Sequence, residues 1–150
     1  MLRLTLTIAL LFIAVTNLSA IENVRVEIIE CGGGKVGFHI EYLNDDGSIK
    51  CTSHFDCSEN HTTNCTPDDF AFDVAVHGQT NTDVTVSHVW DADYSIVELA
   101  SDTEVYVHPT TETAGTIFDL DIAGLAPGDY AVVAVHPVTA NLLGIGVFRI

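Results

Sequence analysis

Apolar and polar residues alternate along much of this chain, with the period of two that is typical of a strand with one buried face. The first such stretch, residues 24–28, places valine and isoleucine on one face and charged residues on the other. The second, residues 35–43, places apolar residues inward and His39 and Glu41 outward. Similar short stretches follow at 70–77, 84–90, 95–99, 104–108, 116–122, 129–135 and 142–150.

Turn residues separate nearly all of these stretches, and no convincing amphipathic helix lies between them. This spacing predicts an all-β protein: a single immunoglobulin-like or jelly-roll-like β-sandwich of about eight or nine strands. Residues 129–135 are apolar on both faces, which is typical of a strand in the middle of its sheet. His88 shares a face with Trp90, so we expect a packed, hydrogen-bonded histidine there.

The end of the 129–135 stretch repeats a short motif found twice earlier in the chain. Val-x-Val-His followed by Gly or Pro places His77, His108 and His136 at strand ends. Imidazole suits Zn²⁺ and Cu²⁺, so these three residues are candidate ligands for copper or zinc. The competing interpretation is that each histidine is an ordinary turn residue and that the protein has no cofactor.

The order of the strands predicts how these histidines are arranged. Neighbouring antiparallel strands alternate in direction, and one expected strand, residues 116–122, separates those that end at His108 and His136. We therefore expect these two histidines at the same end of the fold. A separate strand at 95–99 would send His77 to the opposite end.

One resemblance to known families concerns the last quarter of the chain. Residues 124–132, with His136 and residues 143–145, resemble the closing hairpin of exported β-sandwich families, including prealbumin-like and copper-carrier domains. The resemblance implies the fold and transfers no ligand and no activity.

Residues 1–20 have the composition of a secretory signal peptide: a basic start at Arg3, an apolar run over residues 4–15 and a small last residue, Ala20. We therefore expect residues 21–150 to form one disulfide-stabilised domain that is secreted to the extracellular space. The apolar run is shorter than the ~20 residues of a spanning helix, and no second long run follows. The mature chain is therefore expected to have no membrane span.

The chain is strongly acidic, with a formal net charge of −16. Loss of residues 1–20 changes this charge to −17, because they contain Arg3 and no acidic residue. Such a surface repels phosphate groups, so we expect no nucleic acid partner. The expected partner is an extracellular protein, a glycan or a cation.

Four cysteines follow the expected signal peptide: Cys31, Cys51, Cys57 and Cys65. An even number in an exported chain predicts two disulfides, with three possible pairings. The favoured pairing joins Cys31 to Cys51, across the first turn, and Cys57 to Cys65, around a short loop. Zinc bound by cysteines is the alternative, although the chain has no Cys-x-x-Cys motif.

Residues 51–69 have no apolar periodicity and predict a long surface loop. Asn60 and Asn64 each begin an Asn-x-Thr triplet in this loop and are candidate glycosylation sites, Asn60 before Asn64.

Sequence motifs of catalysis are missing: there is no Gly-x-Ser-x-Gly, no His-Glu-x-x-His and no phosphate-binding glycine loop. We therefore expect a secreted, acidic, non-catalytic binding or matrix protein rather than an enzyme. The alternative is a secreted copper- or zinc-binding protein that uses the strand-end histidines.

Overall fold

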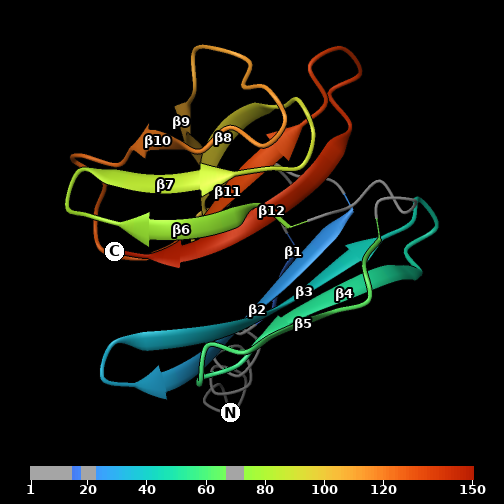
Figure 1. The fold of residues 1–150 in the computed structure, drawn as a ribbon. Helices are drawn as coiled ribbons and strands as arrows, with labels where there is room; N and C mark the ends of the chain where they lie inside the picture. The colour runs from blue at the N-terminus through green and yellow to red at the C-terminus, as the bar shows by residue number, and fades with distance from the viewer. Residues whose placement is uncertain (1–14, 18–22, 67–72) are drawn as a thin grey trace, which may run out of the picture.

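The computed structural model describes residues 15–17, 23–66 and 73–150 (Figure 1). Within these residues there is no helix, and the regular structure consists of twelve strands. The strands are β1 (Val15–Asn17), β2 (Val24–Gly32), β3 (Lys35–Leu43), β4 (Ile49–Phe55), β5 (His61–Thr63), β6 (Ala75–Gln79), β7 (Asp83–Ser87), β8 (Asp93–Glu98), β9 (Thr103–Val107), β10 (Phe118–Asp121), β11 (Asp129–Val135) and β12 (Leu142–Arg149).

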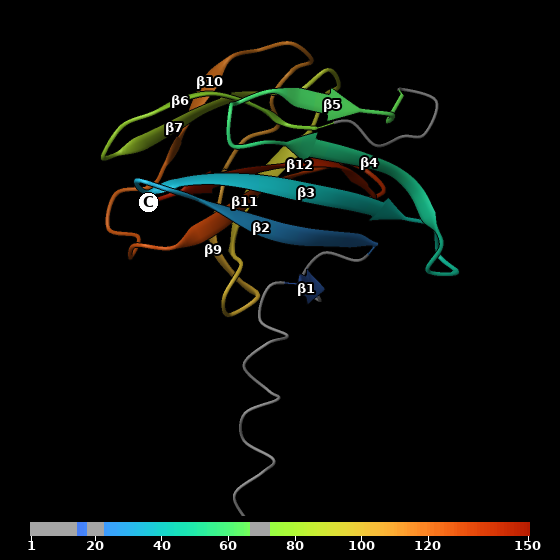
Figure 2. The same ribbon diagram turned by 90° about the horizontal axis from the view of Figure 1, so that it is seen from below.

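These strands form three antiparallel sheets. The N-terminal sheet has the order β1-β2-β3-β4-β5, the central sheet β12-β11-β8-β9, and the small sheet β10-β7-β6. In Figure 2 the strands β2, β3 and β4 of the N-terminal sheet lie in front of β11 and β12. The two larger sheets therefore pack face to face.

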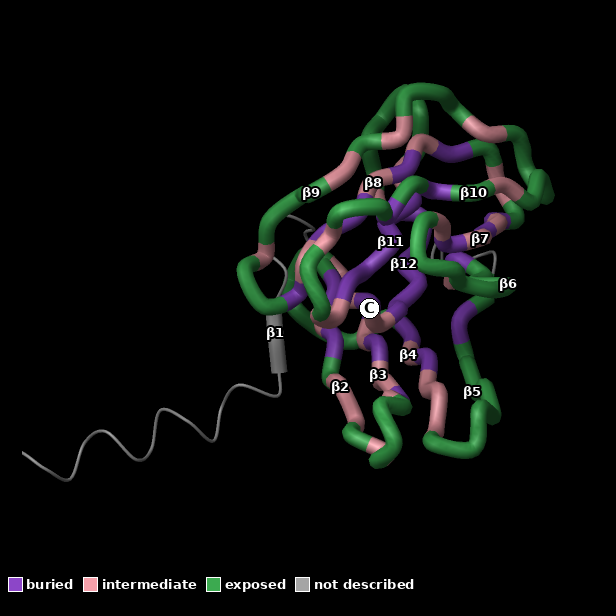
Figure 3. The backbone as a smooth tube through the Cα atoms, turned by 90° about the vertical axis from the view of Figure 1, so that its left-hand side faces the viewer, coloured by how far each residue is buried: buried purple, intermediate pink, exposed green. Residues whose placement is uncertain are grey.

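The central sheet is covered on both faces. Along β11, Ala131 and Val133 pack with Val26 and Ile40 of the N-terminal sheet. Val132, which lies between them in sequence, belongs to a second core shared with the small sheet. Figure 3 shows this burial as purple tube along β11 and β12. The position of β11 between β12 and β8 confirms the central strand predicted from its apolar residues.

The faces predicted for the first two strands are also confirmed. Val24 and Ile40 are buried, whereas His39 and Glu41 are half-buried on the other face of the N-terminal sheet. In the small sheet, β7 contributes two fully buried valines to the second core. The predicted packing of His88 is confirmed, since it is 3% exposed and its ring lies 5.4 Å from that of Trp90.

The all-β class is confirmed, but the number of strands and their topology differ from the expected eight or nine strands in one sandwich. Residues 51–66, expected to be irregular, contain most of β4 and all of β5. Their inward residues include Ser53, which is fully buried. A polar residue at an inward position hides the alternation on which the prediction depends.

The expected signal peptide is described only over β1, which pairs with β2. The remainder of residues 1–20, and residues 67–72 of the expected loop and following strand, lie outside the described residues. No helix in the described residues is long and apolar enough to cross a membrane.

The two predicted disulfides are present, but the favoured pairing was wrong. Cys31 is bonded to Cys57 and Cys51 to Cys65, with Cα–Cα distances of 5.4 and 5.0 Å. Cys51 lies opposite Tyr42, near the end of β3, whereas Cys31 lies at the turn where β3 begins. Strands rise by about 3.3 Å per residue, so Cys31 and Cys51 lie far beyond bonding distance of each other.

Candidate functional site

Three loops gather at one end of the central sheet (Figure 1). Residues 88–92 join β7 to β8, residues 108–117 join β9 to β10, and residues 136–141 join β11 to β12. They meet because β9 and β11 are both antiparallel to β8, so both end where β8 begins. A bridge between Ala92 and Glu112 ties the first two loops together. We call this region the three-loop end.

An open pocket of 760 Å³ lies between the three loops. Its lining residues come from all three loops and from β12: Trp90, Asp91, Thr111, Ala114, His136, Pro137, Val138 and Leu143. Most of these residues are apolar, and Val138 is 87% exposed. A mostly apolar pocket with a few polar groups is the usual form of a binding site.

His136 contributes a hydrogen-bond donor to this pocket. The backbone N–H groups of Val138 and Thr139 donate to its Nδ1 atom, at 3.1 and 3.2 Å. Because Nδ1 accepts these bonds, the proton of the neutral ring is on Nε2. A metal ion at Nε2 would require this proton to move to Nδ1 and would break both bonds. The geometry therefore favours His136 as a donor to a ligand.

His108 anchors the second loop. Its Nε2 atom lies 2.7 Å from Glu112 Oε1 and its ring lies 5.0 Å from the ring of Phe118. The hydrogen bond to His108 lowers the pKa of Glu112 below its usual value. Nδ1 of His108 is buried and has no hydrogen-bond partner within the described residues. The imidazole is thus held between the Glu112 carboxylate and the ring of Phe118.

The strand-end histidines do not form one group. His108 and His136 do leave the sheet at the same end, as predicted, although the strand between theirs is β8 and not residues 116–122. His77 lies on β6, where its Nε2 atom is 2.7 Å from Ser87 Oγ. Across residues 23–66 and 73–150, no three His, Cys, Asp or Glu side chains are grouped so that they could hold one ion. Copper or zinc binding by these histidines stays a prediction.

The charges around the pocket are acidic. Asp91, Asp93 and Glu112 lie on or beside its loops. The four described basic residues lie elsewhere, in β2, β3, β4 and at the far end of β12: Arg25, Lys35, Lys50 and Arg149. A ligand that enters the pocket therefore meets negative charge without a compensating lysine or arginine on these loops.

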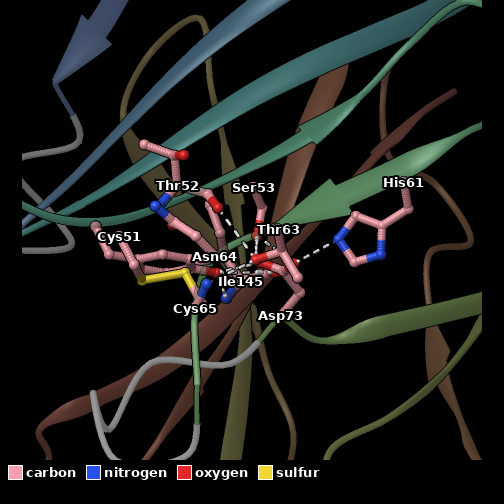
Figure 4. Close-up of a disulfide and its surroundings, with 10 residues drawn as sticks. Cys51, Thr52, Ser53, His61, Thr63, Asn64, Cys65, Asp73 and Ile145 are labelled. Atoms are coloured by element: carbon pink, nitrogen blue, oxygen red, sulfur yellow. Dashed lines mark hydrogen bonds and ion pairs between the residues drawn. A yellow bond between two sulfur atoms is a disulfide. The ribbon is translucent and has the colours of Figure 1, made fainter.

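A second polar cluster lies where the chain passes from the N-terminal sheet to the small sheet (Figure 4). Asp73, whose side chain is 8% exposed, accepts hydrogen bonds from Tyr42 Oη at 2.7 Å and Ser53 Oγ at 2.6 Å. His61 Nε2 lies 3.0 Å from the same carboxylate. Ile145 N, on the edge of the central sheet, donates to Tyr42 Oη. The cluster thus joins the N-terminal sheet to the edge of the central sheet.

The arrangement of the Asp73 cluster differs from that of a nucleophilic triad. In such a triad the histidine lies between the serine and the carboxylate and accepts the serine proton. Here Ser53 and His61 each contact Asp73 Oδ2 directly. The acceptor for the Ser53 hydroxyl is therefore a carboxylate and not a histidine. The contacts of the cluster hold the N-terminal sheet against the edge of the central sheet.

Both candidate glycosylation sites are exposed. Asn60 Nδ2 donates to Asp56 Oδ2 at 3.1 Å, and Asn64 Oδ1 accepts from Thr52 N at 2.7 Å. Cys65, the central residue of the second triplet, is bonded to Cys51. Glycosylation at either asparagine stays a prediction.

Sequence reasoning identified His136 but missed most of its surroundings, because the pocket residues come from three loops, and residues on neighbouring loops are 20 or more positions apart in sequence. Asp73 was not identified either, because its partner Ser53 lies in a segment that was expected to be a loop. Comparisons with protein-family models, with curated proteins and with solved structures find no match to this chain.

Proposed function

We propose that this protein is a secreted, acidic, non-catalytic binding protein with a β-sandwich scaffold, and that it holds a basic segment of an extracellular partner protein in the pocket at the three-loop end. The observation that carries the proposal is this pocket, which combines apolar surface with acidic charge and lies beside exposed loop residues. Loops on a rigid sheet scaffold are a common place for recognition. Two intramolecular disulfides fit the oxidising compartment that secretion implies.

The chemistry of the pocket supports a partner with both apolar and cationic parts. The indole of Trp90 and the side chain of Val138 offer apolar contact to the methylene groups of lysine or arginine. A cation over an indole face gains about 0.5–2 kcal/mol. Asp91 supplies opposite charge, and the Nε2–H of His136 can donate to a backbone carbonyl of the partner.

Two observations support a non-catalytic role. The sequence carries none of the common catalytic motifs. The Asp73 cluster, which contains a serine, a histidine and an aspartate, lacks the contact between serine and histidine that activates a nucleophile.

Trp90 makes the test direct, because it is the only tryptophan of the chain. Its fluorescence can be followed while two synthetic peptides are added, which share apolar residues and differ in carrying either lysine and arginine or glutamate. We expect the basic peptide to change the emission and the acidic peptide to leave it unchanged. We also expect the affinity to fall as salt is added, because exposed charges are screened.

A pair of variants locates the binding. Val138→Lys places a positive charge beside the pocket and should weaken binding of the basic peptide. Ile49→Lys makes the same change at a side chain that is 53% exposed on β4 and should leave binding unchanged. Equal binding of both peptides, or equal affinity of the two variants, would contradict the proposal.

A further inference from the structure

Two histidines lie side by side on the outward face of the N-terminal sheet. His39 on β3 and His54 on β4 are direct partners in the antiparallel register. Direct partners have Cβ atoms about 4.5–5.5 Å apart, so their side chains are neighbours. The two ring centroids are 5.7 Å apart, and both residues are half-buried. The pair presents two imidazoles to solvent from one rigid face.

Two carboxylates lie beside His39. Glu41 lies two residues after His39 on the same face, and its Oε1 atom is 3.8 Å from His39 Nε2. Its other oxygen, Oε2, accepts a hydrogen bond from Arg25 Nη1 at 2.7 Å, which holds the carboxylate in place. Glu27 is the register partner of His39 on β2. Glu41 and Glu27 outnumber Arg25, so the local charge is negative and favours a cation.

We propose that His39, His54 and Glu41 form a binding site for a divalent ion that prefers imidazole, Zn²⁺ or Cu²⁺, on the outward face of the N-terminal sheet. Two imidazoles that share an ion through bonds of about 2.1 Å have ring centroids roughly 5 to 6 Å apart. A nitrogen and an oxygen that share it are about 3.4 Å apart. The distances of 5.7 and 3.8 Å are close to these values. The site is independent of the pocket at the three-loop end.

The backbone that carries the two histidines is held in place on both sides of His54. Cys51 precedes it by three residues and is bonded to Cys65. Cys57 follows it by three residues and is bonded to Cys31. The side chains as they stand do not form a three-ligand group, so the ion must rotate at least one side chain. Because the disulfides already fix the backbone, only the side chain loses conformational entropy when the ion binds.

This site also differs from the strand-end histidines in its chemistry. Nδ1 of His136 accepts two backbone N–H groups and Nε2 of His108 lies against Glu112, so binding at either would break existing bonds. The nearest charged contact of His39 is Glu41 at 3.8 Å, which is longer than a hydrogen bond.

The experiment is a calorimetric titration of the disulfide-bonded protein with Zn²⁺ and with Cu²⁺, without a polyhistidine tag. The variants are His39→Gln, His54→Gln and Glu41→Gln, and the matched control is His77→Gln, an exposed histidine on β6. We expect each of the two histidine variants to weaken binding by roughly tenfold or more and the control to change it by less than about twofold. Thermal unfolding of each apo variant checks that the sheet is intact.

Electron paramagnetic resonance of the wild-type protein with one equivalent of Cu²⁺ gives a readout that needs no variant. Coupling to two imidazole nitrogens supports the site. Three results would overturn it: no binding by the wild type up to about 1 mM ion, wild-type affinity in both His39→Gln and His54→Gln, or loss of binding in His77→Gln.

Discussion

Replacing Tyr42 by phenylalanine should destabilise the protein strongly, although it removes only one oxygen atom. Tyr42 is 2% exposed. Its hydroxyl donates to Asp73 Oδ1 at 2.7 Å and accepts from Ile145 N at 3.1 Å. One hydroxyl therefore satisfies a buried carboxylate and a backbone N–H on the outer edge of β12.

The magnitude follows from these two bonds. A hydrogen bond to a charged group contributes about 1.5–3 kcal/mol, and a buried N–H that loses its partner costs about 1–3 kcal/mol. Asp73 keeps its contacts to Ser53 and His61, which limits the loss at the carboxylate. We therefore expect the free energy of unfolding to fall by about 3 kcal/mol.

Urea unfolding at neutral pH, with the disulfides intact, measures this change. Tyr94→Phe is the matched control, because Tyr94 is 3% exposed and its hydroxyl makes no hydrogen bond within the described part of the chain. Loss of the Tyr94 hydroxyl should lower the free energy of unfolding by less than about 1 kcal/mol. If the two variants lose the same stability, the Tyr42 hydroxyl does not join the sheets as we argue.

Three further predictions concern stability. Gly146→Ala should lower the free energy of unfolding by about 1–3 kcal/mol, because the added Cβ would lie 2.7 Å from the backbone oxygen of Val74. Gly78→Ala is the control, since its added Cβ has no atom within 4 Å, and it should change little in the same urea assay. Burial raises the pKa of Tyr94, so above pH ~10 the unfolded state loses a proton that the folded state keeps. Unfolding free energy should then fall as pH rises from about 10 to 12, and fall less in Tyr94→Phe. Replacing Cys51 and Cys65 by alanine opens a loop with a sequence separation of 14 and should cost about 3 kcal/mol, measured by thermal unfolding.

The alternation of apolar and polar residues predicted the strands whose inward faces are purely apolar. It placed β2 and β3 correctly and identified β11 as a central strand, because β11 is apolar on both sides. For such a strand, its own residues are enough to predict which faces are buried, without knowledge of distant parts of the chain.

The remaining features depend on partners that are distant in sequence. The inward position of Ser53 makes sense only beside Asp73, 20 residues later, which accepts its hydrogen bond. The pairing of Cys31 with Cys57 depends on the register that brings the β2–β3 turn beside the end of β4. The pocket likewise requires three loops that the sheet order brings together, so the sequence could place His136 at a strand end but could not show which residues surround it.

The order of the strands also has a consequence for how the chain folds as it is synthesised. In the N-terminal sheet each strand from β2 to β4 pairs with the next one in sequence, up to β5, so the backbone hydrogen bonds of this sheet can form early. The inward face of this sheet, with Val26 and Ile40, is covered by Ala131 of β11 and Ile145 of β12, the last strands made. Until those strands are available, a preformed sheet presents its apolar face to water. A nascent chain that forms this sheet before β11 and β12 are made is therefore prone to aggregation and suited to binding by a chaperone.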